Sequence, residues 1–385
     1  MNWKPMLAVA LLFVGCGGSS DDEPTDDQAV TVVFGLVTDA QGGPVAGVRV
    51  AGGGAVATTG DDGTYQLDAA ASGEVVVRFE LAGHLRTVRS TAVLEKMPVN
   101  LDVTLVAEAP AMPLDATAGG EVEGARGAKM AAPAGAFVDP MGASVGGMVS
   151  VHLTPLDPGN AAELNAVTGR FVGRDQGGET TLIESFGMIE LTVRQDDATL
   201  QVAPGQTLQV QIPAPAGVAD PPATMPLWSH DPATDTWVEE GTATYDADTG
   251  TYQAEIGHLS SWNCDQPAEA TCITGLVQTP DGDPLPGAAI SASGVDYSGT
   301  STAVSLDDGR FYVAVRRESR VSVLARHASG GGEIREVTSG VEPTSIPPTP
   351  GDPRCLDVGV WTVERGVIRR ETGGGVEVTS CDDVD

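Results

Sequence analysis

Basic and aromatic residues are scarce in this chain of 385 residues. It has 21 Lys and Arg against 53 Asp and Glu, a formal net charge of −32, and only 4% of its residues are Phe, Trp or Tyr. So acidic a chain repels phosphate backbones and anionic lipid surfaces, because binding to either needs clustered cations. The composition therefore excludes nucleic-acid binding and disfavours attachment to a membrane surface through charge.

Hydrophobic runs long enough to cross a membrane are also missing from the N-terminal region. The apolar run at 6–14 has nine residues, whereas a helix that spans a bilayer needs roughly 20. A short basic start followed by an apolar core of this length is typical of an export signal. We therefore expect residues 1–15 to be a signal peptide.

This segment ends in Phe13-Val14-Gly15-Cys16, which resembles a bacterial lipobox. The resemblance implies cleavage before Cys16 and a lipid, including palmitate, on its thiol. Residues 16–28 then form an acidic, Gly- and Ser-containing tether. In lipoproteins an Asp after the lipidated Cys favours the inner membrane; Gly17 stands there, which implies a lipid-anchored outer-membrane protein on the periplasmic or cell-surface side. An ordinary cleaved signal with an incidental Cys is the alternative.

Two segments near the ends of the chain repeat each other. Gly35-Leu36-Val37 aligns with Gly275-Leu276-Val277 (275 − 35 = 240), and each copy continues to an Asp-Asp-Gly turn before an aromatic residue. Apolar residues alternate at the period of two that turns one face of a strand inward. In the first copy these are Val32, Phe34, Leu36, Val48, Val50, Val75, Val77, Phe79, Leu101, Val103 and Leu105. Each repeat is therefore predicted to be a small β-sandwich.

With Leu81-Ala82-Gly83-His84, the repeated pattern resembles carboxypeptidase regulatory-like domains, which are transthyretin-like β-sandwiches. The resemblance covers 29–107 and 271–364 and implies a fold more than an activity. Residues 365–385 remain as a C-terminal tail.

The region 110–265 has signatures of its own. Its segments 130–137 and 148–153 resemble the β-rich domain shared by ankyrins and netrin receptors. The series from 184–191 to 258–265 resembles a module often found next to regulatory-like domains in bacterial surface proteins. Only 159–168 is predicted to form a short helix. With 49 Gly and 26 Pro in the chain, long helices are disfavoured, and the expected fold class is all-β, with tandem sandwiches after the tether.

Catalytic and metal-binding motifs are not found in the sequence. The five His residues lack His-Glu-x-x-His spacing, and neither a Gly-x-Ser-x-Gly elbow nor a phosphate-binding Gly-rich loop is present. His258 beside Ser260 and Ser261 fits a structural strand better than a nucleophile. Acidic turns, such as Asp231 with Asp235, are explained by turn chemistry and lack calcium-loop spacing. We therefore expect no enzyme, no cofactor and no metal.

Three of the five Trp residues, Trp228, Trp237 and Trp262, fall in the middle region. Large indoles usually fill the core of a small β-domain, and this is the favoured interpretation. The alternative is a platform on which sugar rings stack.

Four thiols remain after Cys16, which leaves three full pairings in an exported, oxidising environment. In transthyretin-like sandwiches the first strand and a late strand lie side by side and run parallel. Cys272 and Cys355 open the two corresponding segments, so the resemblance implies a disulfide between them. The alternative joins Cys264 to Cys272 and Cys355 to Cys381.

These observations predict a non-catalytic outer-membrane or cell-surface lipoprotein with a structural or adhesive role. Its partners would be the membrane, through the N-terminal lipid, and an envelope or surface protein. A carbohydrate-binding protein that uses the middle-region Trp residues is the alternative, and an enzyme with an unrecognised site is a third.

Overall fold

The computed structural model describes residues 31–69, 73–94, 97–216, 218, 220–327, 330–364, 368–372 and 375–379. The predicted signal peptide, Cys16 and the tether lie outside the described residues, as does Cys381. Within them the chain is almost entirely β-structure, with one short α-helix, α1 (Ala161–Ala166), and one 3-10 turn (Ala125–Gly127). The all-β prediction is confirmed. None of the described helices has the length and apolar character needed to cross a bilayer.

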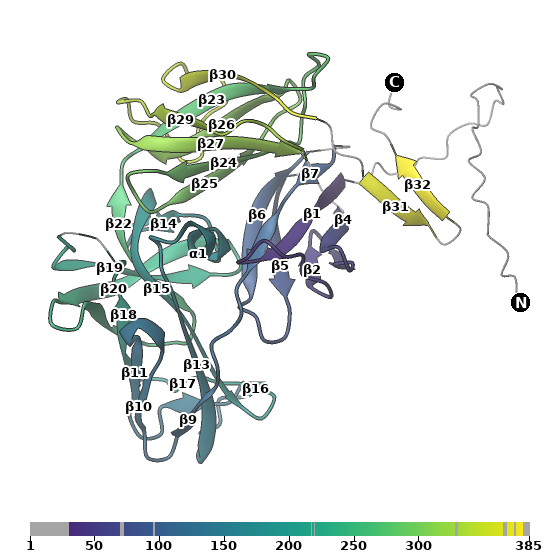
Figure 1. Ribbon diagram of the computed structural model, residues 1–385. Coiled ribbons are helices and arrows are strands. Elements are labelled where there is room, and N and C mark those ends of the chain that lie inside the picture. The colour runs from purple at the N-terminus through teal and green to yellow at the C-terminus, as the bar shows by residue number, and fades with distance from the viewer. Residues whose placement is uncertain are drawn as a thin grey trace, which may run out of the picture.

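The first sandwich has two sheets of four strands (Figure 1). One sheet contains β1 (Thr31–Asp39), β4 (Thr64–Ala69), β7 (Val99–Asn100) and β8 (Val103–Leu105). The other contains β2 (Arg49–Gly52), β3 (Ala55–Thr58), β5 (Gly73–Glu80) and β6 (Thr87–Val93), with β6 at its edge.

The middle domain is built on a large mixed sheet of twelve strands. Its strands are β9 (Met112–Asp115), β10 (Gly120–Glu123), β11 (Lys129–Ala132), β13 (Met148–Leu156), β14 (Val172–Arg174), β15 (Thr180–Gln195), β16 (Ala198–Thr199), β18 (Leu208–Pro213), β19 (Thr224–Asp231), β20 (Thr236–Asp246), β21 (Thr251–Ile256) and β22 (Ser261–Ala268). A separate pair joins β12 (Phe137–Val138) to β17 (Gln201–Val202).

The last sandwich follows β22 almost without a break (Figure 1). One sheet has β23 (Ala270–Gln278), β26 (Arg310–Arg316) and β30 (Leu356–Thr362); the other has β24 (Ala289–Gly294), β25 (Thr300–Val304), β27 (Arg320–His327), β28 (Gly330–Gly331) and β29 (Arg335–Thr338). In the predicted tail, β31 (Ile368–Thr372) and β32 (Gly375–Thr379) pair as a hairpin.

Cys272 and Cys355 form a disulfide, with their Cα atoms 4.6 Å apart. The bond joins corresponding positions because β23 and β30 run parallel, with Ile273 opposite Leu356. The predicted pairing is therefore the one present, and Cys264 is a free, buried thiol. Burial raises the pKa of this thiol well above its ordinary value, because a thiolate there would lose its hydration.

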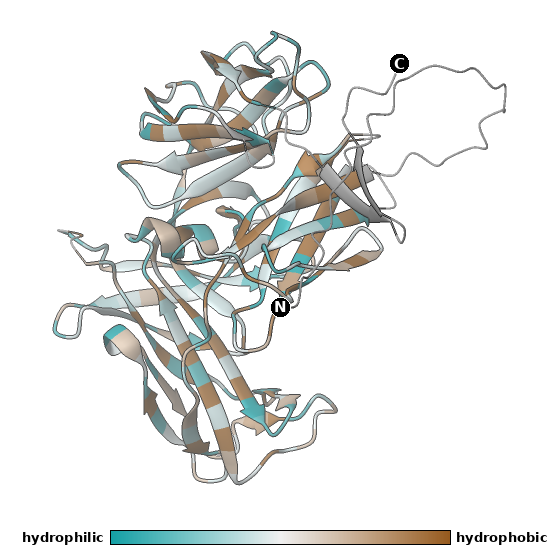
Figure 2. Ribbon diagram, turned by 45° about the vertical axis from the view of Figure 1, so that its right-hand side comes forward, coloured by the Kyte–Doolittle hydropathy of each residue, from teal (hydrophilic) through white to brown (hydrophobic). Residues whose placement is uncertain are grey.

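Apolar side chains alternate along the strands, as the bands of colour in Figure 2 show. Strand β1, however, turns to the core the face opposite to the one predicted from positions 32, 34 and 36. Val33 and Val37 are fully buried in the core, whereas Leu36 is 36% exposed. Phe34 lies edge-on to His327 of the last sandwich, at 5.5 Å between ring centroids. The period of two could not choose a face here, because both sets of alternating positions carry apolar residues.

A hairpin turn of the first sandwich recurs in the middle domain, which the sequence analysis missed. Asp39 Oδ1 accepts hydrogen bonds from the N–H groups of Gln41 and Gly43, each at 2.8 Å. Asp139 Oδ1 accepts from Met141 at 2.9 Å and from Ala143 at 2.8 Å. The two turns share the sequence pattern Asp-x-x-Gly at an offset of 100 (139 − 39). A pattern of four residues is too short to stand out beside longer motifs.

Candidate functional site at the junction of the first sandwich and the middle domain

The edge strand β6 of the first sandwich docks on the middle domain through its backbone. The Val88 N–H donates to Thr168 Oγ at 3.0 Å, and the Gly169 N–H donates to the Val88 carbonyl at 3.2 Å. Val88 is only 1% exposed. The outward groups of this strand are thus bonded by the neighbouring domain, as the burial of an edge requires.

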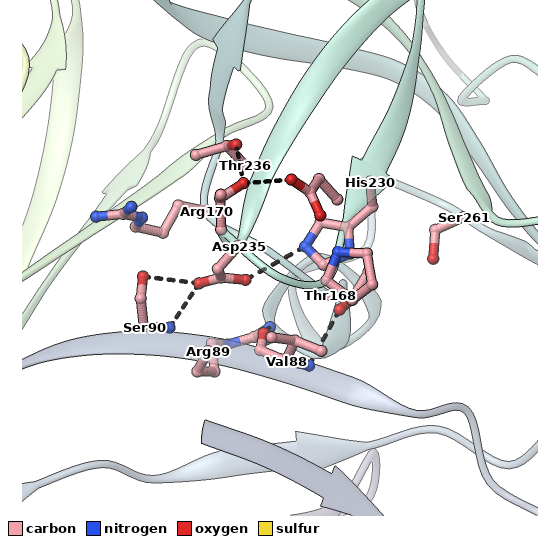
Figure 3. A network of polar contacts seen from close by, with 12 residues as sticks. Val88, Arg89, Ser90, Thr168, Arg170, His230, Asp235, Thr236 and Ser261 are labelled. Atoms are coloured by element: carbon pink, nitrogen blue, oxygen red, sulfur yellow. Dashed lines mark hydrogen bonds and ion pairs between the residues drawn. The ribbon is translucent and has the colours of Figure 1, made fainter. Parts of the chain in front are cut away.

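Asp235 is the centre of this junction, and its side chain is fully buried (Figure 3). Its Oδ2 accepts from the Ser90 N–H at 2.5 Å and from Ser90 Oγ at 2.8 Å, and its Oδ1 lies 3.3 Å from His230 Nε2. The backbone φ of Asp235 is +55°, in the left-handed region where Asp and Asn are tolerated better than most residues. A tight turn, in which the Asp235 N–H donates to the Asp231 carbonyl at 2.9 Å, therefore aims the carboxylate at β6.

Two arginines of the first sandwich also reach the middle domain. Arg89 donates to the carbonyl of Asn165 at 2.8 Å, which satisfies a carbonyl in the last turn of α1. Arg78 donates to the Pro232 carbonyl at 3.0 Å. Burial lowers the pKa of the Arg89 guanidinium, and the nearby Asp235 carboxylate opposes this. The junction thus pairs a desolvated cation with a buried anion.

The junction does not have the geometry of a serine hydrolase, although it contains Ser90, Asp235 and His230. In a catalytic triad the imidazole lies between the hydroxyl and the carboxylate, whereas here the carboxylate lies between the other two groups. Ser90 is also 6% exposed and Asp235 is fully buried. The arrangement can bind two domains together, but it cannot move a proton from serine to histidine.

His258, Ser260 and Ser261 do not converge either. His258 Nε2 lies 3.0 Å from Glu240 Oε2, Ser260 Oγ donates to the His230 carbonyl at 3.3 Å, and Ser261 donates to Glu190. Among the described residues, no group of three or more His, Cys, Asp or Glu could hold a metal ion.

The three tryptophans of the middle domain are core residues. Trp228, Trp237 and Trp262 are at most 1% exposed. Trp228 Nε1 donates to the Asp265 carbonyl at 3.1 Å, and Trp262 Nε1 donates to the His258 carbonyl at 3.3 Å. A sugar ring would need an open indole face, so none of the three can serve as the stacking platform of the alternative interpretation. Trp228 and Trp237 instead pack with Leu85 of the first sandwich.

A small cavity lies where the first sandwich meets β15 and β22. Its lining includes Leu85 and Arg86 on one side and Glu190, Ser261 and Trp262 on the other. Its volume of about 10 Å³ has room for about one water molecule and none for a substrate.

The carboxyl group of Glu190 beside this cavity has a perturbed pKa. Burial raises the pKa of Glu190 to about 7; the Ser261 hydroxyl and Arg86 lower it, and Glu108 raises it. Glu108 is itself bound to Arg194 at 2.7 Å and lies 3.3 Å from His152. Glu190 therefore ionises at the junction only at a free-energy cost.

We expect this cost to make stability depend on pH. The pKa of Glu190 is about 7 in the folded chain and ordinarily 4.5, so the folded state holds the proton more tightly. The contribution of Glu190 to stability is then fully present below pH 4.5 and is lost as pH rises through about 7. Replacing Glu190 with Gln should remove this fall and raise the free energy of unfolding at pH 8 by about 1–3 kcal/mol. The upper end corresponds to the full pKa shift, and solvent screening of this partly exposed side chain reduces the effect.

The measurement is urea unfolding at a series of pH values. Glu255→Gln, on an exposed position of β21, is the matched control and should leave the pH profile unchanged. A profile of Glu190→Gln that still falls between pH 4.5 and 7 as in the parent chain would contradict the assignment.

The last sandwich is fixed to both other parts of the chain. The Ser185 N–H donates to the Ser298 carbonyl at 2.8 Å, and Arg316 forms an ion pair with Glu184 at 2.8 Å. The Asn100 N–H of the first sandwich donates to the Gly287 carbonyl at 3.2 Å. All three parts therefore contact one another.

No family model matches the chain. Over 154 residues the chain is 30% identical to cartilage intermediate layer protein 2 of Mus musculus, a match that covers 36% of this chain and 13% of that protein. The chain thus spans about an eighth of this curated relative.

Among solved structures, three similar chains are bacterial surface or other bacterial proteins of low sequence identity to this chain, at 8–10%. The TIE protein of Bacillus anthracis has a TM-score of 0.19 and 10% identity, over 87% of this chain and 51% of that one, so this chain spans about half of it. The major pilin subunit BcpA of Bacillus cereus has a TM-score of 0.18 and 8% identity, over 86% and 99% of the two chains. The major pilin SpaD of Corynebacterium diphtheriae has a TM-score of 0.18 and 9% identity, over 89% and 99%. Scores this low carry no argument about function.

Proposed function

We propose that this chain is an exported, lipid-anchored protein of the outer membrane that binds another envelope or surface protein and catalyses no reaction. The observation that carries the proposal is that the side chains most like a catalytic set are bonded to one another across a domain junction. This group consists of Ser90, Asp235 and His230, and its hydrogen bonds join the first sandwich to the middle domain.

Mutual docking of the three parts also supports a structural or binding role. A chain whose sandwiches are held together through buried polar bonds presents its outer loops and sheet edges in fixed positions. Such fixed surfaces lower the entropic cost of binding, because fewer loops must become ordered when a partner binds. The lipobox-like segment ending in Cys16 supplies the anchor in this proposal.

The anchor is tested by replacing Cys16 with Ser. The variant should lose incorporation of labelled palmitate and leave the membrane fraction, because the acidic tether has no other membrane affinity. Cys264→Ala keeps Cys16 and is the control that should retain the label. Label and membrane fractionation that persist in Cys16→Ser would refute the anchor.

Partner binding is tested by crosslinking on intact envelopes, followed by purification of the chain. One envelope protein should be enriched from cells with the parent chain, and the same protein should be lost when Asp235→Ala loosens the docked domains. Enrichment that is the same for both chains would argue against a surface set by domain docking.

A further inference from the structure

Strand β29 of the last sandwich is the structural equivalent of β6. In the first sandwich Val77 pairs with Arg89, and in the last Val323 pairs with Arg335, with both valines fully buried. The offset of 246 (335 − 89) also relates the two Asp-Asp-Gly turns (307 − 61). Ladder register and sequence thus agree on the equivalence.

The two strands have opposite surroundings. The middle domain covers the edge of β6, where Val88 is 1% exposed. The residue equivalent to Val88 in the last sandwich is Ile334, directly before β29, and it is 67% exposed. Because Val88 and Ser90 turn their N–H groups outward, the same alternation turns those of Ile334, Glu336 and Thr338 outward. Among the described strands, only β27 pairs with β29.

Two residue types that commonly protect a sheet edge are missing around β29. Residues 333–341 contain neither Lys nor Pro, the residues that commonly block edge pairing. One carbonyl of β30, the edge strand of the facing sheet, is bonded by a side chain of β29. Arg335 donates to its Val360 carbonyl at 2.6 Å and lies over the Trp361 ring at 4.2 Å. Strand β29 is thus an edge strand of this sandwich, and no described strand pairs with its outer side.

The charge and shape of this edge fit a second copy of the chain. Glu336 is paired with Arg320, and Glu333 with Arg335, so the edge is locally neutral on a molecule of net charge −32. Two acidic molecules meet with least repulsion at such a place. Ile334 and Val341, at the two ends of the edge, are 67% and 61% exposed.

We propose that two copies of this chain pair edge to edge through β29, antiparallel about a two-fold axis at Val337. In this register Ile334 of one copy lies opposite Gly340 of the other (334 + 340 = 2 × 337), where no side chain blocks it. The Gly340 carbonyl accepts from the Glu318 N–H of its own chain at 3.1 Å, so the new backbone bonds lie between Glu336 and Thr338. Glu336 lies opposite Thr338 of the second copy. A two-fold axis makes both contacts twice and closes the assembly at two copies, which leaves no free β29 edge.

The test is the oligomeric state of the purified full chain, measured by sedimentation velocity in the micromolar range. Thr338→Pro removes an outward N–H and leaves the inward bonds of β29 to β27 in place. Its matched control is Thr338→Ala. We expect a dimer for the parent chain and for Thr338→Ala, and a dissociation constant at least about tenfold higher for Thr338→Pro.

Ile334→Lys provides a second variant, because this exposed position tolerates substitution without loss of the fold; it should also weaken the dimer. The far-ultraviolet spectrum and the retained Cys272–Cys355 bond show whether each variant is folded. A parent chain that stays monomeric throughout the range, or a folded Thr338→Pro chain that dimerises like the parent, would overturn the proposal. Either result leaves the proposed lipid anchor and envelope partner untouched.

Discussion

Replacing Asp235 with Ala will lower the free energy of unfolding by about 3–5 kcal/mol, because it removes a fully buried carboxylate from the junction and leaves its donors without acceptors. Ser90 loses the acceptor of both its N–H and its hydroxyl, and His230 loses the oxygen 3.3 Å from its Nε2. Alanine also fits the φ of +55° poorly. Urea unfolding followed by tryptophan fluorescence is the measurement, since Trp237 packs 5.3 Å from the His230 ring.

Two controls separate the junction from the loss of a negative charge in general. Asp235→Asn keeps one oxygen acceptor and tolerates the backbone conformation, so it should cost less than Asp235→Ala. Asp248→Ala, at an exposed turn position, should change stability by no more than about 0.5 kcal/mol. Equal effects of Asp235→Ala and Asp248→Ala would contradict the role given to this carboxylate.

A double-mutant cycle with Ser90→Ala measures the contact itself. If Ser90 and Asp235 stabilise the junction together, the double variant will be less destabilised than the sum of the single ones, by about 1 kcal/mol or more. Strictly additive effects would mean that the destabilisation by Asp235→Ala does not arise from its contact with Ser90.

Removing the Cys272–Cys355 disulfide, by replacing both residues with Ala, will destabilise the last sandwich by up to about 4.5 kcal/mol. The bond closes a segment with a sequence separation of 83, and the chain-entropy estimate for such a loop is near that value. The effect matters because β30 follows a long connection from β29 and is held to the sheet on one side, by β23. Unfolding without reductant is the measurement.

Cys264→Ala is the control for the disulfide, because Cys264 is buried and free. It should cost about 1 kcal/mol and leave the Cys272–Cys355 peptide unchanged in a non-reducing map. A map in which Cys264 is joined to Cys272, or a double variant as stable as the parent, would contradict this prediction.

Much of the architecture could be predicted from local signals. Strands follow from alternation, as at Val75, Val77 and Phe79, all buried in the core, and α1 falls inside the predicted 159–168. The disulfide followed from the family resemblance, which implied parallel strands at Cys272 and Cys355. These features depend on residues close in sequence, or on a repeat that the chain displays twice.

The site and the edges were decided by the tertiary structure. Ser90 and Asp235 are separated by 145 positions, and Asp235 looked like an ordinary turn residue because nothing beside it in the sequence marks its partner. Strand β1 could not show which face is buried, because apolar residues occupy both. The equivalent strands β6 and β29 carry similar local signals, yet one is covered and the other open. Burial depends on which surfaces meet when the domains pack, and that depends on contacts between residues far apart in the chain.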